Sequence, residues 1–162
     1  MIMTTTKKDN YVINILKEKA TESKLRMKHC ACLTCGGKVM CINVNTSRTK
    51  FCSAILPCGH SELMCIYEWW NTCKKKVDKK KRKLSRMKLY VLRLKPNGKM
   101  GNSAPCILCT NFMKECGIKK ISYSDSDGNI ISINISDYDT KHESNGFIAT
   151  KGSCRILKFP FK

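Results

Sequence analysis

The stretch Pro105-Cys106-Ile107-Leu108-Cys109 places two cysteines at the expected start of a helix. Pro105 suits the first turn, where its missing N–H leaves no hydrogen bond unmade, and Gly117 suits the position just past the helix end. The two thiols then lie one turn apart on one face, and the helix N-terminus favours their negative charge. A Cys-x-x-Cys pair taken alone is equally typical of a redox dithiol or of half a structural zinc site.

A second stretch, Gly59-His60-Ser61-Glu62, precedes apolar residues at helical spacing, so the histidine and the glutamate lie at the N-terminus of another helix. His60, Cys106 and Cys109 together supply three protein ligands. A hydrolytic zinc site needs that number, because its fourth position must stay open for water. We therefore expect one Zn²⁺ per chain at these three residues.

The chain of 162 residues is long enough for one domain with a sheet and too short for two comfortable cores. The periodicity predicts the order helix, hairpin, helix, strand, helix, strand, strand. Gly36-Gly37 accepts the positive φ angles of a tight hairpin turn. The expected helices cover 11–25, a stretch beginning at 61, and 105–117, and the expected strands cover 29–35, 38–45, 89–94, 118–124 and 131–136.

The apolar runs are too short for a membrane span, and residues 1–10 are polar, without the apolar core of a signal peptide. We therefore expect a reducing compartment, cytoplasmic or nuclear, or a virion. The twelve cysteines then serve as thiols or metal ligands and not as a disulfide framework. Cys30, Cys32, Cys35 and Cys41 leave open a second zinc cluster across the hairpin, although strand alternation divides them between two faces.

The formal charge of +19 points to a polyanionic neighbour, because unneutralised positive charge repels itself. The charge is concentrated in residues 74–88, where only Asp78 is acidic. This run predicts either a contact with nucleic acid or phosphate, or a solvated helix extension or mobile loop. The candidate polyanion-binding residues are Lys74, Lys75, Lys76, Lys79, Lys80, Lys81, Arg82, Lys83, Arg86 and Lys88.

The two zinc motifs resemble those of the cytidine deaminase superfamily, and the resemblance covers about residues 11–136. His60-Ser61-Glu62 matches the His-x-Glu motif, and residues 105–109 match Pro-Cys-x-x-Cys. The resemblance implies a three-layer α/β/α fold with a mixed sheet of about five strands. The short turn before Ile130 resembles the branch whose last two strands form an antiparallel hairpin. The predicted organisation is a polar segment 1–10, a deaminase-like zinc domain 11–136 with a basic insert 74–88, and an extension 137–162.

The same resemblance assigns roles to residues. It implies that Glu62 is a proton shuttle and not a ligand, that Asn45 contacts the substrate sugar, and that the carbonyl of Ala104 accepts a hydrogen bond from the departing amino group. The reaction implied is hydrolytic attack on C4 of a cytosine or, less favoured, C6 of an adenine. Within the superfamily, the approach to Cys106 is most similar to that of uncharacterised deaminase-like proteins of large DNA viruses and protists.

Two functions follow from these features. One is zinc-dependent deamination of a nucleoside, nucleotide or nucleic acid, which Glu62 favours because a structural zinc site needs no shuttle. The alternative is a non-enzymatic, zinc-stabilised structural or packaging protein, such as a basic virion component, which the charge favours. It would bind nucleic acid or an acidic partner, and homo-oligomers or virion assembly partners are compatible with either function.

Overall fold

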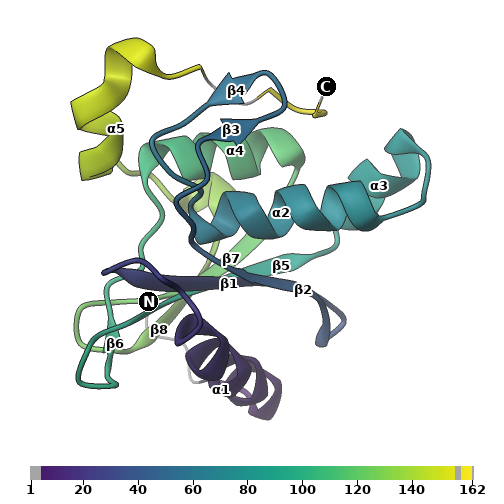
Figure 1. The fold of residues 1–162 in the computed structure, drawn as a ribbon. Helices are drawn as coiled ribbons and strands as arrows, with labels where there is room; N and C mark the ends of the chain where they lie inside the picture. Colours follow the sequence, from purple (N-terminus) through teal and green to yellow (C-terminus); the bar gives the residue numbers. More distant parts are fainter. Residues whose placement is uncertain (1–4, 156–157, 162) are drawn as a thin grey trace.

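The computed structural model describes residues 5–155 and 158–161. Residues 1–4 of the predicted polar segment, and 156, 157 and 162 of the predicted extension, lie outside this description. The chain forms a mixed α/β fold in which helices cover both faces of one sheet (Figure 1). The helices are α1 (Lys7–Ala20), α2 (Ser61–Thr72), α3 (Val77–Leu84), α4 (Ile107–Cys116) and α5 (Asn145–Thr150), with short 3-10 turns η1 (Ile135–Asp137) and η2 (Lys151–Ser153).

The main sheet has the strand order β2-β1-β5-β7-β8, and the short β6 pairs with β5. All neighbours are antiparallel except β5 and β7, which run parallel. The predicted mixed sheet and the antiparallel last hairpin are therefore confirmed. The strands are β1 (Lys28–Cys35), β2 (Lys38–Val44), β5 (Lys88–Leu94), β6 (Met100–Gly101), β7 (Lys120–Ser124) and β8 (Ile130–Asn134), with a separate hairpin of β3 (Lys50–Phe51) and β4 (Ala54–Ile55).

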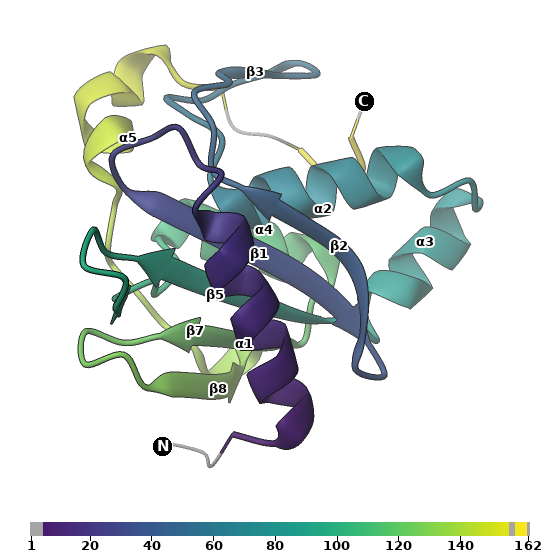
Figure 2. The ribbon, with the colours of Figure 1, turned by 60° about the horizontal axis from the view of Figure 1, so that its bottom comes forward.

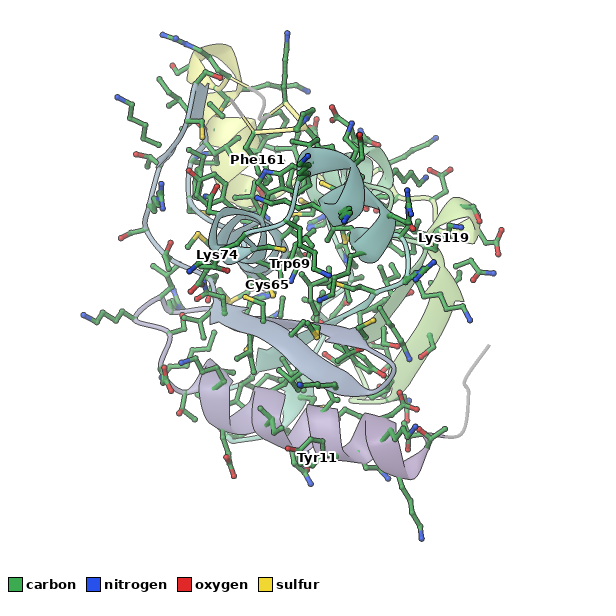
Figure 3. The ribbon with its side chains drawn as sticks, turned by 90° about the vertical axis from the view of Figure 1, so that its right-hand side faces the viewer. Tyr11, Cys65, Trp69, Lys74, Lys119 and Phe161 are labelled. Carbon is green, nitrogen blue, oxygen red and sulfur yellow. The ribbon has the colours of Figure 1, made fainter. Side chains whose placement is uncertain are left out.

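Two apolar clusters lie on opposite faces of the sheet. On one face α1 crosses the strands (Figure 2) and packs on Cys30, Cys32 and Leu92. On the other face α2 and α4 cover Leu33 and Val91. Figure 3 shows Cys65 and Trp69 of α2 between that helix and the sheet, whereas Tyr11 of α1 points outward. Alternate side chains of β1 thus pack into the apolar cluster under α1 and into the one under α2 and α4.

The same alternation settles where the hairpin cysteines lie. Cys30 and Cys32 belong to the cluster under α1, whereas Cys35 and Cys41 pack against the cluster under α2. Within residues 5–155 and 158–161, only one group of His, Cys, Asp or Glu side chains has metal-binding geometry, and it does not include these four. They act as small apolar side chains in two separate layers.

The boundaries of two helices, α1 and α4, differ from those predicted. Helix α1 begins at Lys7, not Tyr11, because Thr6 and Asp9 form a capping box, and it ends at Ala20. Helix α4 begins at Ile107 with Cys106 as its N-cap, so Pro105 precedes the helix. Gly117 ends α4 with a φ of 82°, as its position predicted. None of the helices in the described part of the chain is both long and apolar enough to cross a membrane.

The pattern missed α5 and the short strands β3, β4 and β6, which are too short to show a period. Within the basic insert 74–88, residues 77–84 form a separate helix, α3, short connections flank it, and Lys88 is the first residue of β5. Phe147, Phe159 and Phe161 of the predicted extension pack back onto the domain as buried or half-buried side chains. Phe159 lies edge-on to Trp70, with ring centroids 4.7 Å apart, and Phe161 lies 5.0 Å from Tyr67.

Asp9 ties the start of α1 to the centre of the sheet. Its carboxylate accepts hydrogen bonds from the Thr6 backbone N–H (2.9 Å), from Lys88 Nζ (3.2 Å) and from the Tyr90 hydroxyl. Partial burial raises the pKa of Asp9, but the hydrogen bonds from Thr6, Tyr90 and Lys88 outweigh it and hold the pKa well below its usual value. A carboxyl group with a depressed pKa stabilises the folded state above its unfolded pKa.

We therefore predict that Asp9→Asn lowers the free energy of unfolding at pH 7 by about 1–2 kcal/mol, through loss of the cap and of a charged acceptor. The difference from wild type should shrink as the pH falls below about 4, where the unfolded carboxyl becomes protonated and the folded one follows. Urea titrations at pH 7 and pH 3 measure both effects. Asp139→Asn, an exposed carboxylate, is the control, and equal stability of all three proteins at pH 7 would contradict the assignment.

Candidate metal centre

Two helix N-termini bring the predicted metal ligands together. His60 is the N-cap residue of α2, Cys106 is the N-cap residue of α4, and Cys109 lies in the first turn of α4. The two helices lie side by side on the same face of the sheet and contact each other (Figure 1). Both N-cap residues have extended backbone conformations. His60 and Cys106 therefore lie at the N-terminal ends of α2 and α4, where the two helices come together.

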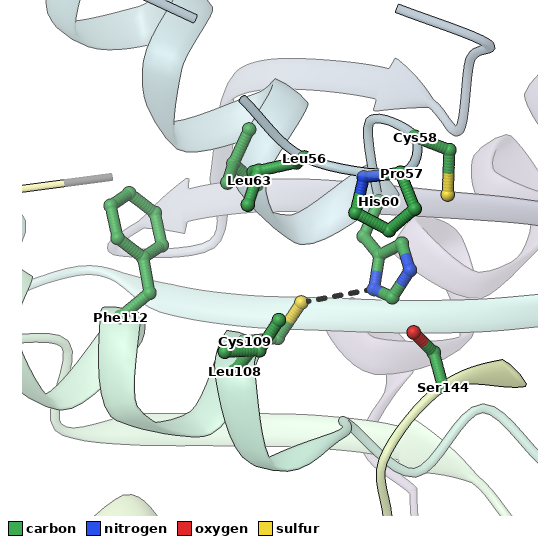
Figure 4. Close-up of a pocket in the computed structure, with 9 residues that line it drawn as sticks. All are labelled: Leu56, Pro57, Cys58, His60, Leu63, Leu108, Cys109, Phe112 and Ser144. Carbon is green, nitrogen blue, oxygen red and sulfur yellow. Dashed lines mark hydrogen bonds between the residues drawn. The ribbon is translucent and has the colours of Figure 1, made fainter. Parts of the chain in front are cut away.

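The three ligand atoms fit one zinc ion. Nδ1 of His60 lies 3.3 Å from Sγ of Cys109 and 3.6 Å from Sγ of Cys106, and all three atoms lie within 4.8 Å of one another. Figure 4 shows the imidazole directed at Cys109. Tetrahedral coordination with Zn–S of about 2.3 Å and Zn–N of about 2.0–2.1 Å requires an N···S separation of about 3.6 Å. The side chains are therefore close to the arrangement that a bound ion needs.

The electrostatics of the three groups also favours a cation. Hydrogen bonds from Cys109 and His60 outweigh burial and lower the pKa of Cys106 to about 4. Burial lowers the pKa of His60, but hydrogen bonds to Cys106 and Cys58 raise it to about 11. The hydrogen bond to Cys106 and burial raise the pKa of Cys109. The protons on His60 and Cys109 thus stabilise the Cys106 thiolate, and a metal ion bound by the three groups would displace them.

Glu62 lies beside the ligand group, on the first turn of α2. Its side chain is only 5% exposed, and the Ser61 hydroxyl donates a hydrogen bond to its Oε2 at 3.2 Å. Burial raises the pKa of Glu62, while the nearby His60 lowers it in part. A buried carboxyl group with a raised pKa holds a proton more readily at neutral pH than an exposed one does. Such a group can both accept and donate a proton.

Comparison with solved structures shows which known proteins share this fold. A cytidine deaminase from Burkholderia pseudomallei superposes with a TM-score of 0.57 at 17% identity, covering 83% of this chain and 95% of its own. The chain has the cytidine deaminase fold. A dCMP deaminase from the cyanophage S-TIM5, in complex with dCMP and dUMP, superposes with a TM-score of 0.52 at 16% identity, covering 76% of this chain and 85% of its own. Neither a sequence-family model nor a curated protein matches the chain.

In this deaminase fold a cavity of about 40 Å³ lies against the ligand group (Figure 4). Its walls are mainly apolar. A water molecule needs roughly 10–15 Å³ of such volume, so the cavity holds a few waters and no more. The lining residues are Leu56, Pro57, Cys58, His60, Leu63, Leu108, Cys109, Phe112 and Ser144.

The segment after Asp137 forms part of this wall. The Ile107 backbone N–H donates to the carbonyl of His142 at 2.8 Å, and the Tyr138 hydroxyl donates to the carbonyl of Pro105 at 2.9 Å. These two bonds hold residues 138–144 against the start of α4 and place Ser144 opposite His60 (Figure 4). Sequence patterns missed Ser144, because periodicity is lost in this region and nothing marks it as close to the metal ligands.

Of the predicted metal, catalytic and substrate residues, only His60 and Cys109 line the cavity; Cys106, Glu62, Asn45 and Ala104 do not. The amide oxygen of Asn45 accepts hydrogen bonds from the Ser23 hydroxyl (2.7 Å) and the His29 backbone N–H (3.0 Å), and its amide nitrogen donates to the Met27 carbonyl (2.6 Å). Asn45 therefore joins the end of β2 to the segment between α1 and β1. Ala104 lies two residues before Cys106, and its N–H donates to the Asn102 side chain at 2.9 Å. Their substrate contacts remain predictions.

Purified protein should contain about one zinc per chain. We predict that Cys106→Ala and Cys109→Ala each lose the metal and lower the midpoint of thermal unfolding by roughly 10 °C or more, because metal binding contributes directly to folding. Metal analysis and thermal scans measure both. Cys116→Ala removes a buried thiol at the far end of α4 and should keep the zinc. Well-folded wild type without zinc would rule out the site, and two zinc ions per chain would indicate a second one.

Proposed function

We propose that the protein is a zinc-dependent hydrolase that removes the amino group of a cytosine-containing nucleoside, nucleotide or nucleic acid. One observation carries the proposal. The three-ligand group of His60, Cys106 and Cys109 has a buried carboxylic acid, Glu62, beside it on the same helix as the histidine. Two structures with this fold are named for the deamination of cytidine and of dCMP, which supports cytosine over adenine as the reacting base.

The chain divides the chemistry between the ligand group and Glu62. A zinc ion with three protein ligands lowers the pKa of water to about 7 and so supplies a nucleophile at neutral pH. Glu62 would take a proton from the attacking water, pass it to the ring nitrogen and return a proton to the leaving amine. Burial suits Glu62 to this work, because a raised pKa brings its two protonation states closer together in energy near pH 7.

The apolar cavity beside the ligands supports a flat ring as the group that enters. Leu63, Leu108 and Phe112 form apolar walls, and ring faces pack well on such side chains. Ligand pockets for small molecules usually have about 300–1,000 Å³, so a cavity of about 40 Å³ must widen to admit a base. Ser144 is the wall residue from the C-terminal segment, and we infer that this segment moves when substrate enters. Asn45 and Ala104 are the proposed contacts of the sugar and the amino group.

The decisive experiment is a deamination panel of cytidine, deoxycytidine, their monophosphates, adenosine, and single-stranded DNA and RNA. We predict that Glu62→Ala retains zinc and folding but loses on the order of 10²–10⁴ in rate, because the proton carrier is gone. Glu18→Ala, which removes an exposed carboxylate on α1, should match wild type. If wild type binds zinc and releases no ammonia from any substrate, the enzyme proposal fails and a zinc-stabilised structural protein replaces it.

A second variant tests the cavity itself. Ser144 also caps α5 by accepting a hydrogen bond from the Phe147 N–H at 3.3 Å. Ser144→Ala removes this cap without filling the cavity and is therefore the control for a larger side chain at the same position. We predict that Ser144→Phe lowers kcat/KM at least about ten-fold relative to Ser144→Ala, with zinc content unchanged, because the ring occupies the place of the substrate base. Equal kinetics of the two variants would show that substrate binds elsewhere.

A further inference from the structure

A second cavity lies at the other end of α2, between the basic insert and the β1–β2 hairpin. It has a volume of about 290 Å³ and is formed almost entirely by cations. We call it the basic cleft. It is lined by Cys35, Lys75, Lys79, Arg82, Lys83 and Arg86. Figure 3 views the molecule from the side of α3 and shows Lys74, where the chain leaves α2 toward this helix.

The period of α3 divides the basic run into two groups with different surroundings. Lys79, Arg82 and Lys83 follow the spacing i, i+3, i+4, which places them on one face of α3. Arg86 lies in the turn just past the helix end, where its N–H donates to the Lys83 carbonyl at 3.1 Å. Lys80 instead donates to the Trp70 carbonyl at 2.6 Å and lies 5.0 Å from the Trp70 ring centroid. The first group lines the cleft, whereas Lys80 holds the helix on α2.

The remaining contacts of the run support the same division. Lys81 lies 5.6 Å from the centroid of the Phe159 ring, so it covers the C-terminal segment. Lys88 pairs with Asp9 on the α1 face of the sheet, at 3.2 Å. Neither residue lines the cleft. Of the ten candidates for polyanion binding, the fold therefore gathers five around one concave surface.

Among the residues that the structure describes, none is an acidic partner of the five cleft cations. In the described ranges, residues 5–155 and 158–161, the ion pairs are Lys19–Glu22, Lys88–Asp9 and Lys151–Glu143, and none involves the cleft. Asp78, on the first turn of α3, is exposed and does not line it. Like charges that converge on one cavity repel each other, and a bound anion relieves that repulsion.

The lining indicates the chemical class of the anion. It contains no aromatic side chain on which a base could stack and no amide or carboxylate that could read a base or sugar edge. Lysine and arginine are the side chains that bind phosphate groups. Five cations around one cavity match several phosphates held close together, whereas a strand of nucleic acid spreads its phosphates along an extended path.

The position of the cleft separates it from the metal centre. His60 precedes α2 and Lys75 follows it, and a helix of 12 residues is about 18 Å long. The phosphate of a mononucleotide whose base lies at His60 does not reach that far. The basic cleft is therefore a different site from the proposed substrate cavity.

We propose that the basic cleft binds a small ligand that carries two or more adjacent phosphate groups. The proposal does not depend on the deaminase activity, because its residues and cavity are separate from those of the metal centre. It narrows the polyanion prediction from the whole run of residues 74–88 to the face that lines the cavity.

The test is calorimetric titration of the full-length, zinc-loaded protein with inorganic tripolyphosphate at about 150 mM salt, where the Debye length is about 8 Å and distant charges are screened. The cleft variant is Lys79→Gln/Arg82→Gln/Lys83→Gln. The matched control, Lys50→Gln/Lys99→Gln/Lys120→Gln, removes the same charge from exposed positions elsewhere. Circular dichroism and zinc content establish that both variants are folded.

We expect one tripolyphosphate per chain for wild type and control, and binding weaker by about ten-fold or more for the cleft variant. Equal affinities for both variants would overturn the proposal, because binding would then follow net charge and not the cleft. Single-stranded DNA of 12 nucleotides is the second arm. If it binds tighter than tripolyphosphate and only the cleft variant loses it, the cleft is a nucleic-acid surface and the proposal is wrong.

Discussion

The convergence of two helix N-termini on one group of soft ligands is the constraint on which this structure depends. His60 and Cys106 are cap residues, so each lies where its helix begins, and Cys109 follows one turn later. The positive ends of both helices favour thiolate charge at this point, and a bound zinc ion would neutralise it. The sheet carries α2 and α4 on one face and thereby sets the distance between residues that are 46 and 49 positions apart along the chain.

Glu62 and the cavity take their properties from the same arrangement. The first turn of α2 points into the core, so a carboxyl group that is ordinarily solvated becomes almost fully buried beside the ligands. Its raised pKa follows from that burial. The chain returns over α4, held by the bonds from Ile107 to His142 and from Tyr138 to Pro105, and leaves a cavity of about 40 Å³ beside the ligands. Access to the ligand group is thus narrow.

The fold also determines the surroundings of the positively charged side chains. The concentration of positive charge in residues 74–88 does not by itself show which of these side chains would bind an anion. Some of these cations make contacts within the fold: Lys80 packs on the Trp70 ring, and Lys88 pairs with Asp9. Five other cations, three on α3 and one on each side of it, line an open cavity. The two ends of α2 therefore differ in kind: one gathers metal ligands around a small apolar cavity, and the other gathers cations around a larger open one.

Local spacing in the sequence predicted most of the helices and strands: residue pairs one helical turn apart, alternation along strands, and Gly36-Gly37 at a turn. The mixed sheet and the antiparallel last hairpin were predicted from the resemblance to the cytidine deaminase superfamily. Two short motifs predicted the ligand set, whose atoms the fold brings within 4.8 Å of one another. The sequence also divided the hairpin cysteines between two faces, because side chains alternate along a strand whatever the strand packs against. It did not show Ser144 at the metal site, the amide of Asn45 bound to Ser23 and His29, or five of the ten cations around one cavity. Those features depend on contacts between segments far apart in the chain, and no local period records them. Only the tertiary structure, which brings distant segments into contact, decided them.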